Sequence, residues 1–184
     1  MEERWKGLVN APNVLTIIRL LLIPVMWHFL NQDCMMCALA VFCLAGFTDV
    51  VDGYLARKNS QITWFGKLAD PLADKLMTLT LMVGLYKKGI LPVTPFIILF
   101  IKELLMLIGA VFLLKQKQVV YSKAIGKLAQ FTIFLSLVLS FFYEYFNSID
   151  FPLHIIMLWA GVSLALAALL YYAHQNIFSY FKNK

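Results

Sequence analysis

Four aspartates stand at helical intervals in the stretch 49–74 of an otherwise largely apolar sequence. Asp49 and Asp52 are three residues apart, and Asp70 and Asp74 are four apart. Either spacing places both carboxylates on one face of a helix. Carboxylates that converge near lipid repel one another unless cations lie between them, and ligand sets made only of carboxylates suit hard ions such as Mg²⁺, Mn²⁺ or Ca²⁺. The pattern predicts a divalent metal site.

Three further residues on the same predicted helix extend this site. Gly53 and Ala56 are small and leave room for a ligand near the backbone, and Arg57 follows Gly53 by about one turn. A guanidinium group suits phosphate, so metal-binding carboxylates with an arginine predict phosphoryl transfer. The alternative is a set of helix-end charges that reach the membrane interface. Lysine and arginine do this readily, whereas aspartate side chains are too short.

The composition requires that these residues be positioned by membrane helices. The sequence is 61% hydrophobic and 14% charged, which is too apolar for a soluble globular domain. The net charge of +6 comes from basic residues that lie mostly between apolar segments, so topology and anionic lipid explain it better than nucleic acid does. The N-terminal residues "MEERWKGLVNAPN" lack the pattern of a cleavable signal peptide.

Six apolar segments are each long enough to cross a bilayer as a helix. They cover approximately 14–30, 35–55, 66–86, 90–114, 124–142 and 152–172. The connections are short, which favours antiparallel neighbours in one bundle. We therefore expect an all-α integral membrane protein, a six-transmembrane-helix bundle forming a single domain over residues 1–184. An amphipathic juxtamembrane segment with Trp5 and Lys6 precedes the bundle.

Lysine and arginine are distributed unequally between the two ends of these segments. One side carries Arg4, Lys6, Arg57, Lys58, Lys67, Lys115, Lys117, Lys123, Lys127, Lys182 and Lys184. The other side carries only Lys87 and Lys88 as basic residues, with three acids. The positive-inside rule therefore predicts that both termini and the stretch 49–74 face the cytoplasm, in a cell membrane.

The cysteines and histidines suggest no further chemistry. Cys34 and Cys37 have C-x-x-C spacing, but no second pair and no histidine cluster accompanies them. We interpret them as small packing residues of a membrane helix. The three histidines are far apart in the sequence.

The full motif reads Asp49-x-x-Asp52-Gly53-x-x-Ala56-Arg57, eight residues, then Gly66-x-x-x-Asp70-x-x-x-Asp74. It resembles the signature of the CDP-alcohol phosphatidyltransferases at every fixed position. The resemblance implies an enzyme that transfers the phosphatidyl group of a CDP-linked lipid to an alcohol and releases CMP. It also implies two Mg²⁺ or Mn²⁺ ions and a homodimer.

The resemblance assigns roles to residues of the motif. Asp49, Asp52 and Asp70 would bind one metal, and Asp49, Asp70 and Asp74 the second. Asp74 would also deprotonate the acceptor hydroxyl, as a general base. The nucleotide and its diphosphate would be held by Asp52, Gly53, Ala56, Arg57 and Gly66.

Two more stretches resemble phosphatidylglycerophosphate synthases. "PNVLTIIRL" contains Asn13, Thr16 and Arg19 at helical spacing, which could line the nucleotide pocket. For the first two, capping of the helix start is an equally good explanation. "DPLADK", which ends at Lys75, is similar to the same synthases and also to the CMP-forming cardiolipin synthases.

The acceptor phosphate would require cations besides the metals. The candidates are Lys75, Lys102, Lys123 and Lys127. Lys102 and Glu103 lie within an apolar segment, where ionisable residues usually face a cavity or each other. Lys123 and Lys127 are four apart at a predicted cytoplasmic helix start, which positive-inside topology would also explain.

We therefore expect transfer from CDP-diacylglycerol to glycerol 3-phosphate, yielding phosphatidylglycerophosphate. The first alternative is a CMP-forming cardiolipin synthase with phosphatidylglycerol as acceptor. A divalent-cation transporter is the alternative from another class, since intramembrane carboxylates also mark ion pathways. A transporter would place its acids near the bilayer midplane and has no use for the Gly-x-x-Ala-Arg element.

Overall fold

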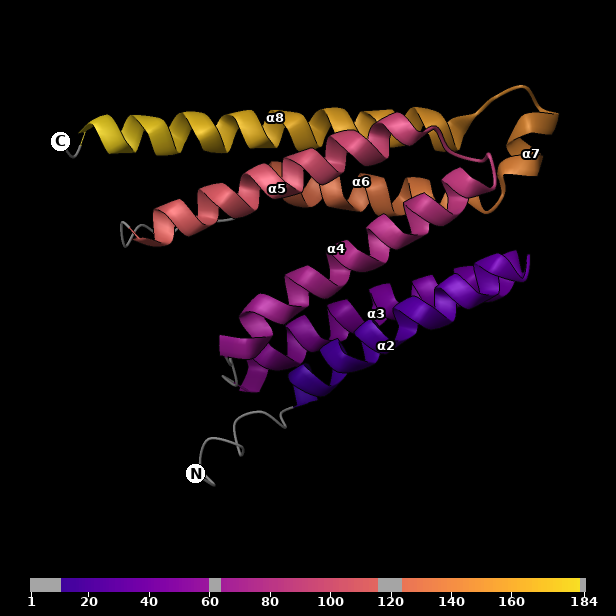
Figure 1. Cartoon of the computed structure of the whole chain (residues 1–184), viewed down its shortest axis with the longest axis horizontal. Coiled ribbons are helices and arrows are strands. Elements are labelled where there is room, and N and C mark those ends of the chain that lie inside the picture. The colour runs from indigo at the N-terminus through magenta and orange to yellow at the C-terminus, as the bar shows by residue number, and fades with distance from the viewer. Residues whose placement is uncertain (1–10, 60–63, 116–123, 183–184) are drawn as a thin grey trace. The chain divides into compact units, whose positions relative to one another are not determined.

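The computed structural model describes the backbone of residues 11–59, 64–115 and 124–182, and the side chains of 14–48, 72–106 and 124–173. Within these ranges the chain is helical and contains no strand (Figure 1). The helices are α2 (Ala11–Asn31), α3 (Met35–Asn59), α4 (Trp64–Lys87), α5 (Val93–Lys115), α6 (Ala124–Ser140), α7 (Tyr143–Ser148) and α8 (Leu153–Lys182). They form two compact units, residues 1–87 with α2–α4 and residues 88–184 with α5–α8.

The six long helices coincide with the six predicted apolar segments, so the helical prediction is confirmed. Two features differ from it: α8 continues to Lys182, and the short helix α7 was not predicted. The last turns of α8 are too polar for a membrane segment, yet they contain no glycine or proline to end the helix. The amphipathic segment with Trp5 and Lys6 lies outside the described residues.

Membrane-spanning character is clearest in two helices. Among the described residues, Val14–Asn31 of α2 and Leu153–Ala173 of α8 are long and apolar enough to cross a bilayer. Met35–Thr48 and Ala124–Ser140 are shorter apolar helices. These two helices are candidate spans by length and composition, and the count of six spans stays a prediction.

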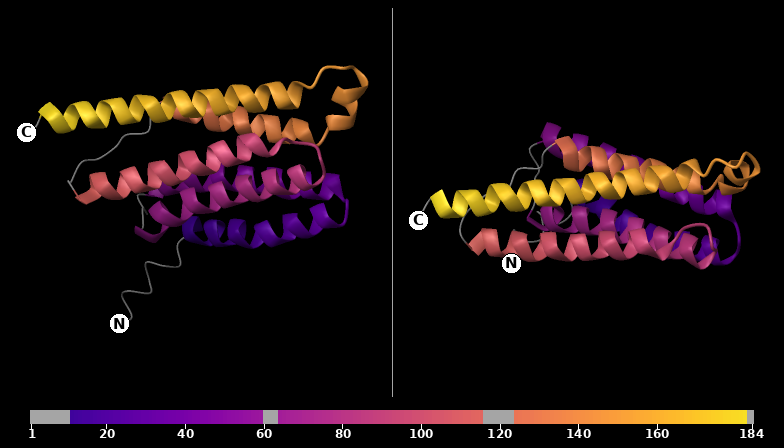
Figure 2. Two further views of the ribbon diagram at one scale, coloured as in Figure 1. Left: turned by 45° about the horizontal axis from the view of Figure 1, so that its top comes forward. Right: turned by 90° about the horizontal axis from the view of Figure 1, so that it is seen from above.

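In the first unit, α2 packs against both α3 and α4 (Figure 2). Gly84 of α4 lies so close to α2 that a Cβ on it would be 2.6 Å from Leu30 Cδ1. Small residues at helix contacts permit this approach in membrane proteins, where close packing replaces the hydrophobic effect. Three residues further along α4, Lys87 Nζ lies 4.7 Å from the centre of the Trp27 ring. This cation–π contact joins the same ends of the two helices.

In the first half of helix α2, buried residues include polar ones and the exposed residues are apolar. Thr16 and Arg19 are 0% and 1% exposed. The exposed face carries Val14, Ile17, Ile18, Leu21 and Val25. A soluble helix has the opposite arrangement, whereas an ionisable residue in a membrane helix turns toward the protein interior. The orientation of α2 therefore agrees with a lipid-facing outer surface.

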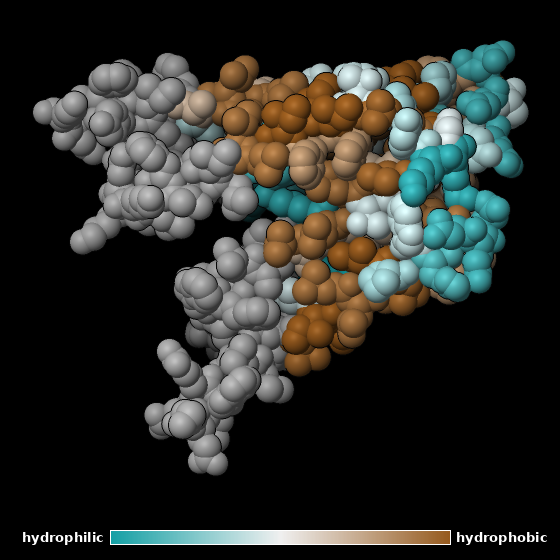
Figure 3. Space-filling view, in the orientation of Figure 1, coloured by the Kyte–Doolittle hydropathy of each residue, from teal (hydrophilic) through white to brown (hydrophobic). Residues whose placement is uncertain are grey.

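In the second unit, α6 and α8 form the closest helix pair, and α5 and α7 also contact α8. Gly161 of α8 lies against Ile133 of α6. The buried residues of α8 include Leu158, Val162, Ala165 and Ala168, spaced three and four apart. In the space-filling view, apolar side chains cover much of α8, and hydrophilic ones gather at the end that carries α7 (Figure 3). This is the distribution expected of a lipid-facing helix with a connection in water.

His154, at the start of α8, has a structural role. Its ring is 2% exposed, lies 5.9 Å from the Phe146 ring of α7, and hydrogen-bonds the backbone of Ile90. These contacts hold the connection before α5 and the short helix α7 against the first turn of α8.

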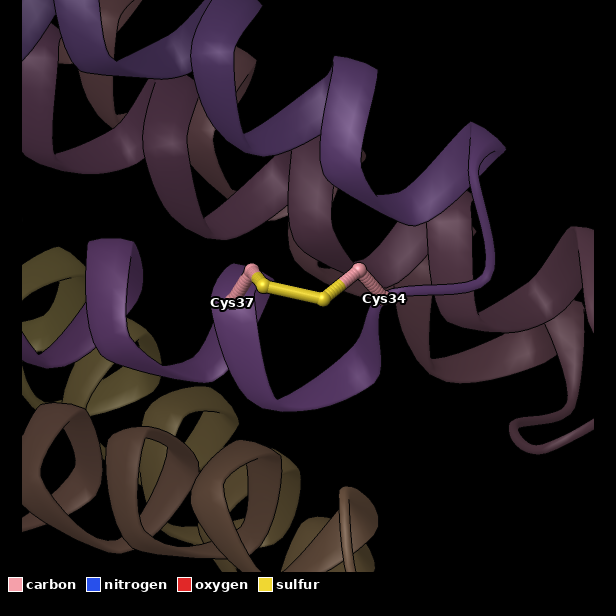
Figure 4. The surroundings of a disulfide bond; sticks show 2 residues. All are labelled: Cys34 and Cys37. Carbon is pink, nitrogen blue, oxygen red and sulfur yellow. A yellow bond between two sulfur atoms is a disulfide. The ribbon is translucent and has the colours of Figure 1, made fainter.

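The cysteines differ from the sequence-based interpretation. Cys34 and Cys37 form a disulfide at the start of α3 rather than acting as separate packing residues (Figure 4). Cys34 immediately precedes the helix and Cys37 lies in its first turn, so the three-residue spacing brings their side chains together. Their Cα atoms are 5.3 Å apart, within the usual range for a disulfide. Cys43 is a free thiol.

Candidate active site

The four motif aspartates lie on the two helices of one antiparallel pair, α3 and α4. Asp49 is ten residues before the end of α3, and Asp74 is ten residues after the start of α4. Asp52 and Asp70 are seven and six residues from the same helix ends. At 1.5 Å per residue, both pairs lie about 10–15 Å from these ends. The two acidic pairs therefore occupy one level of the first unit.

Helix α2 adds a polar segment at this level. It runs in the same direction as α4, and the contact of Leu30 with Gly84 aligns the two helices. Arg19 lies eleven residues before Leu30, and Ala73 lies eleven residues before Gly84. The buried Arg19 is therefore level with Ala73 and Asp74 to within about one turn. The same difference in residue number that separates Leu30 from Gly84 places Thr16 level with Asp70.

Among the predicted metal ligands, Asp74 has a described side chain. It is half-buried and interacts with its surroundings. Its neighbour Lys75 is also half-buried and has interactions of its own. The described side chains contain no group of three or more metal-binding residues. The other predicted metal and nucleotide residues lie on α2, α3 and α4, but their side chains are outside the described set: Asn13, Asp49, Asp52, Gly53, Ala56, Arg57, Gly66 and Asp70.

The donor set at this level fits a hard divalent ion. It consists of four carboxylates brought to one height by two neighbouring helices, and neither helix carries a histidine or cysteine there. Oxygen-only ligation is typical of Mg²⁺, Mn²⁺ and Ca²⁺ and not of zinc. The chemistry of the residues is therefore compatible with the predicted metal pair.

The predicted acceptor lysines lie in the second unit, apart from Lys75. Lys102 Nζ lies 2.6 Å from Glu103 Oε1, and the two side chains are 14% and 21% exposed. Of the two arrangements expected for these residues, the structure has them facing each other. A phosphate that used Lys102 would therefore compete with a carboxylate already in place. Lys127 is exposed on the first turns of α6, and Lys123 lies outside the described residues.

One polar group beside Lys127 is absent from the sequence-based prediction. The hydroxyl of Tyr172 in α8 lies 3.2 Å from the position that a Cβ would take on Gly126 in α6. The two residues are far apart in the sequence, and an interfacial tyrosine at the end of an apolar segment gives no signal of such a contact.

Comparison with known proteins identifies the family. The family model described as CDP-alcohol phosphatidyltransferase matches residues 9–167. The chain belongs to this family. The match covers α3 and α4, which carry the full motif, and extends through both compact units. The predicted resemblance is thereby confirmed, and the class of chemistry is that of a phosphatidyltransferase.

Three individual relatives illustrate the similarity. A protein of Aquifex aeolicus named CDP-diacylglycerol–glycerol-3-phosphate 3-phosphatidyltransferase is 33% identical over 133 residues, 71% of this chain and 74% of the relative. One of the same name from Rickettsia typhi is 38% identical over 99 residues, 52% of this chain and 56% of the relative. Human cardiolipin synthase (CMP-forming) is 35% identical over 127 residues, 68% of this chain and 40% of the relative. The chain thus spans about half the length of several relatives that it matches.

Proposed function

We propose that this chain transfers the phosphatidyl group of CDP-diacylglycerol to glycerol 3-phosphate and releases CMP. The observation that carries the proposal is the common level of the two aspartate pairs on α3 and α4, with Arg19 of α2 beside them. Two of the relatives described above have names that state this reaction, which supports the choice of acceptor.

The reaction that we propose needs a base at the acceptor hydroxyl. Asp74 takes the hydroxyl proton, and the hydroxyl oxygen forms a bond to the phosphorus that carries diacylglycerol. The bond from that phosphorus to the bridging oxygen of CMP breaks, and CMP leaves. An alcohol is a poor nucleophile at neutral pH, so a carboxylate within reach of its proton accelerates the step.

Asp49, Asp52, Asp70 and Asp74 would hold two divalent ions, Mg²⁺ or Mn²⁺. When bound, these ions spread the negative charge of the diphosphate and stabilise the leaving CMP. Because the four aspartates lie at one level of the α3–α4 pair, the two ions would also be held at that level. Members of the family generally use divalent ions, which agrees with the oxygen-only donor set.

The nucleotide half of the substrate is assigned to the first unit. Gly53 and Ala56 leave the α3 backbone accessible, and Arg57 provides a cation for the diphosphate. Gly66 on α4 and Asn13, Thr16 and Arg19 on α2 complete the assignment. The burial of Thr16 and Arg19 supports a role inside the protein rather than at the lipid surface. The acceptor phosphate is assigned to Lys75 and to Lys102, Lys123 and Lys127.

In our proposal α2, α3, α4, α5, α6 and α8 all cross the bilayer, and α7 lies in the water-exposed connection. Both termini and the aspartates face the cytoplasm, where soluble glycerol 3-phosphate is available. The excess of lysine and arginine near the corresponding helix ends supports this orientation. The family match runs through both compact units, which supports one functional domain over residues 1–184. We also propose a homodimer, which cross-linking in native membranes would test.

The second candidate is a CMP-forming cardiolipin synthase. It is favoured by the human relative of that name, which aligns with 68% of this chain. The chemistry at the aspartates would be the same, and the acceptor would be phosphatidylglycerol. The distinction depends on the acceptor residues rather than on the metal site.

The test uses the purified full-length protein with labelled CDP-diacylglycerol, Mg²⁺ and one acceptor at a time. We expect CMP release and a product of the mass of phosphatidylglycerophosphate with glycerol 3-phosphate. Turnover only with phosphatidylglycerol would establish the second candidate. Absence of CMP release with either acceptor, together with uptake of radioactive Mn²⁺ into proteoliposomes, would favour the transporter instead.

A further inference from the structure

The short helix α7 in the second unit has two exposed sides of opposite character. Residues three and four apart share one side of a helix. Phe142, Tyr145 and Ile149 have this spacing along α7 and its two ends, and they are 43%, 64% and 50% exposed. We call these three residues the apolar stripe. The other exposed side carries Glu144, Asn147 and Ser148.

The apolar stripe lies on the side of α7 that is turned toward α8. Phe146 is 9% exposed and packs against His154 in the first turn of α8. The ring of Tyr145, in the stripe, lies 5.6 Å from the Phe146 ring and meets it edge-on. Successive residues of a helix are about 100° apart, so Glu144 and Ser148, each two residues from Phe146, point nearly the opposite way. The polar side of α7 therefore faces away from the contact with α8.

The apolar stripe lies close to the point where α8 becomes apolar. The candidate span of α8 begins at Leu153, four residues after Ile149. A tight helix end separates the two: Asp150 has a left-handed φ of 51°, and the Phe151 N–H donates to the Phe146 carbonyl at 3.1 Å. Phe151 is itself 51% exposed. Apolar and aromatic side chains are thus gathered at the end of a candidate span, where membrane proteins carry their interfacial aromatic residues.

Lipid explains the apolar stripe better than water or a protein partner does. Single exposed apolar side chains are common on soluble surfaces, but a stripe on one side of a helix next to a candidate span indicates a contact. A soluble partner that approached from water would meet the polar side of α7 first. Three side chains are also far fewer than a stable protein interface uses.

We propose that the apolar stripe and Phe151 insert into the boundary between lipid headgroups and acyl chains, while the polar side of α7 stays in water. The connection between α6 and α8 then has one side in water and one in lipid. Helices with one apolar and one polar side lie in the membrane plane at this depth. Because α7 packs on the first turn of α8, its insertion fixes the depth of α8 at this end.

The first experiment compares the two sides of α7 in the full-length protein. Ile149→Cys and the matched control Asn147→Cys are each made in a Cys43→Ser background, where the remaining cysteines are joined in the disulfide Cys34–Cys37. A nitroxide label on the new cysteine is studied by electron paramagnetic resonance in vesicles of phosphatidylcholine and phosphatidylglycerol. The measurement is the collision rate of the label with oxygen, which concentrates in lipid, relative to a nickel chelate, which stays in water.

The ratio of oxygen to nickel collisions should be several times higher at position 149 than at position 147. Tyr145→Cys should behave like Ile149→Cys, and Ser148→Cys like Asn147→Cys, so the result does not depend on one variant that folds poorly. A ratio at 145 and 149 no higher than at 147 and 148 would place the stripe in water and overturn the inference.

A second experiment distinguishes lipid from protein. A fluorophore on the same cysteines is observed in vesicles whose phosphatidylcholine carries bromine on its acyl chains, which quenches fluorophores in contact with lipid. Quenching should be strong at Ile149→Cys and weak at Asn147→Cys. Protection of position 149 from oxygen and nickel alike, without quenching by the brominated lipid, would show that a protein surface such as a second copy of the chain covers the stripe, and would also overturn the inference.

Discussion

Ile133 in α6 lies with its backbone against Gly161 in α8. A Cβ on Gly161 would be 2.7 Å from Ile133 Cγ1 and 3.1 Å from its backbone nitrogen. The contact between Gly84 and Leu30 in the first unit is similarly short, but there the three nearest atoms all belong to side chains, those of Leu30 and Trp27. A leucine side chain can change its rotamer, whereas a helix backbone can move only with its whole helix. Gly84 thus permits a side chain to pack closely against a helix, whereas Gly161 permits the backbones of two helices to approach each other.

This difference predicts unequal costs of adding a methyl group. Gly161→Ala should destabilise the protein by about 1–3 kcal/mol, as expected for an overpacked contact. Gly84→Ala should cost less, because Leu30 can move and alanine favours the helix. Thermal unfolding of both variants in the same detergent would compare them. Equal midpoints would contradict the assignment of the Gly161 contact to backbone.

The metal assignment predicts loss of activity without loss of the protein from the membrane. Asp49→Asn, Asp70→Asn and Asp74→Asn should each abolish CMP release, because an amide has nearly the shape of the acid but cannot provide the charge or accept the proton. Asp33→Asn, outside the motif, is a control that should retain activity. If all three motif variants keep a tenth or more of the wild-type rate, the assignment is wrong.

Removing the metal tests the role of the same four aspartates without changing the sequence. EDTA should abolish CMP release, and added Mg²⁺ or Mn²⁺ should restore it, because oxygen-only sites bind these ions reversibly. Zn²⁺ at the same concentration should restore little. Full turnover in a preparation shown to be free of metal would rule out the proposed role of the aspartates.

The assignment of substrates to residues predicts opposite kinetic effects of two substitutions. Lys127→Gln should raise KM for glycerol 3-phosphate by roughly tenfold to a hundredfold, since a hydrogen bond to a charged group contributes about 1.5–3 kcal/mol. Its KM for CDP-diacylglycerol should change little. Arg57→Gln should show the reverse pattern. Similar effects of both variants on both substrates would contradict the separation of nucleotide and acceptor residues.

The disulfide predicts the number of reactive thiols. With Cys34 and Cys37 joined, the unfolded protein should take up one maleimide per chain, at Cys43, before reduction. After reduction it should take up three, the total number of cysteines. Mass spectrometry of the intact chain distinguishes these products. Three labels without prior reduction would show that the pair is a dithiol in the membrane-derived protein.

The proposed membrane orientation is compatible with a disulfide between Cys34 and Cys37. It places Cys34 at the outer face of the membrane, where disulfides persist, while the aspartates lie on the cytoplasmic side. A cysteine-reactive probe that cannot cross membranes, applied to intact cells after reduction, should therefore reach Cys34. If Cys34 were labelled only after lysis, it would lie on the cytoplasmic side, and the proposed orientation would be wrong.

Local periodicity in the sequence was sufficient to determine the membrane class, the six long helices and the aspartate motif. Each of these depends on residues three or four apart, or on the composition of one continuous segment, so no distant contact is needed to recognise it. The length of α8 was underestimated because hydropathy reports where a helix leaves lipid, not where it ends. Helix α7 was missed because six residues carry too little periodic signal.

Contacts between distant residues were decided only by the tertiary structure. Leu30 against Gly84 brings Arg19 to the level of Asp74, and Gly126 meets Tyr172 across α6 and α8. Lys102 was expected to face either a cavity or its neighbour in the sequence, and the structure shows it paired with that neighbour, Glu103. Such choices depend on how side chains from separate helices share space, and a membrane sequence encodes this weakly, because apolar surfaces face lipid and protein alike. The spacing of the aspartates therefore predicts the chemistry, whereas the close approach of α2 and α4 at Gly84 determines which residues of α2 lie level with them.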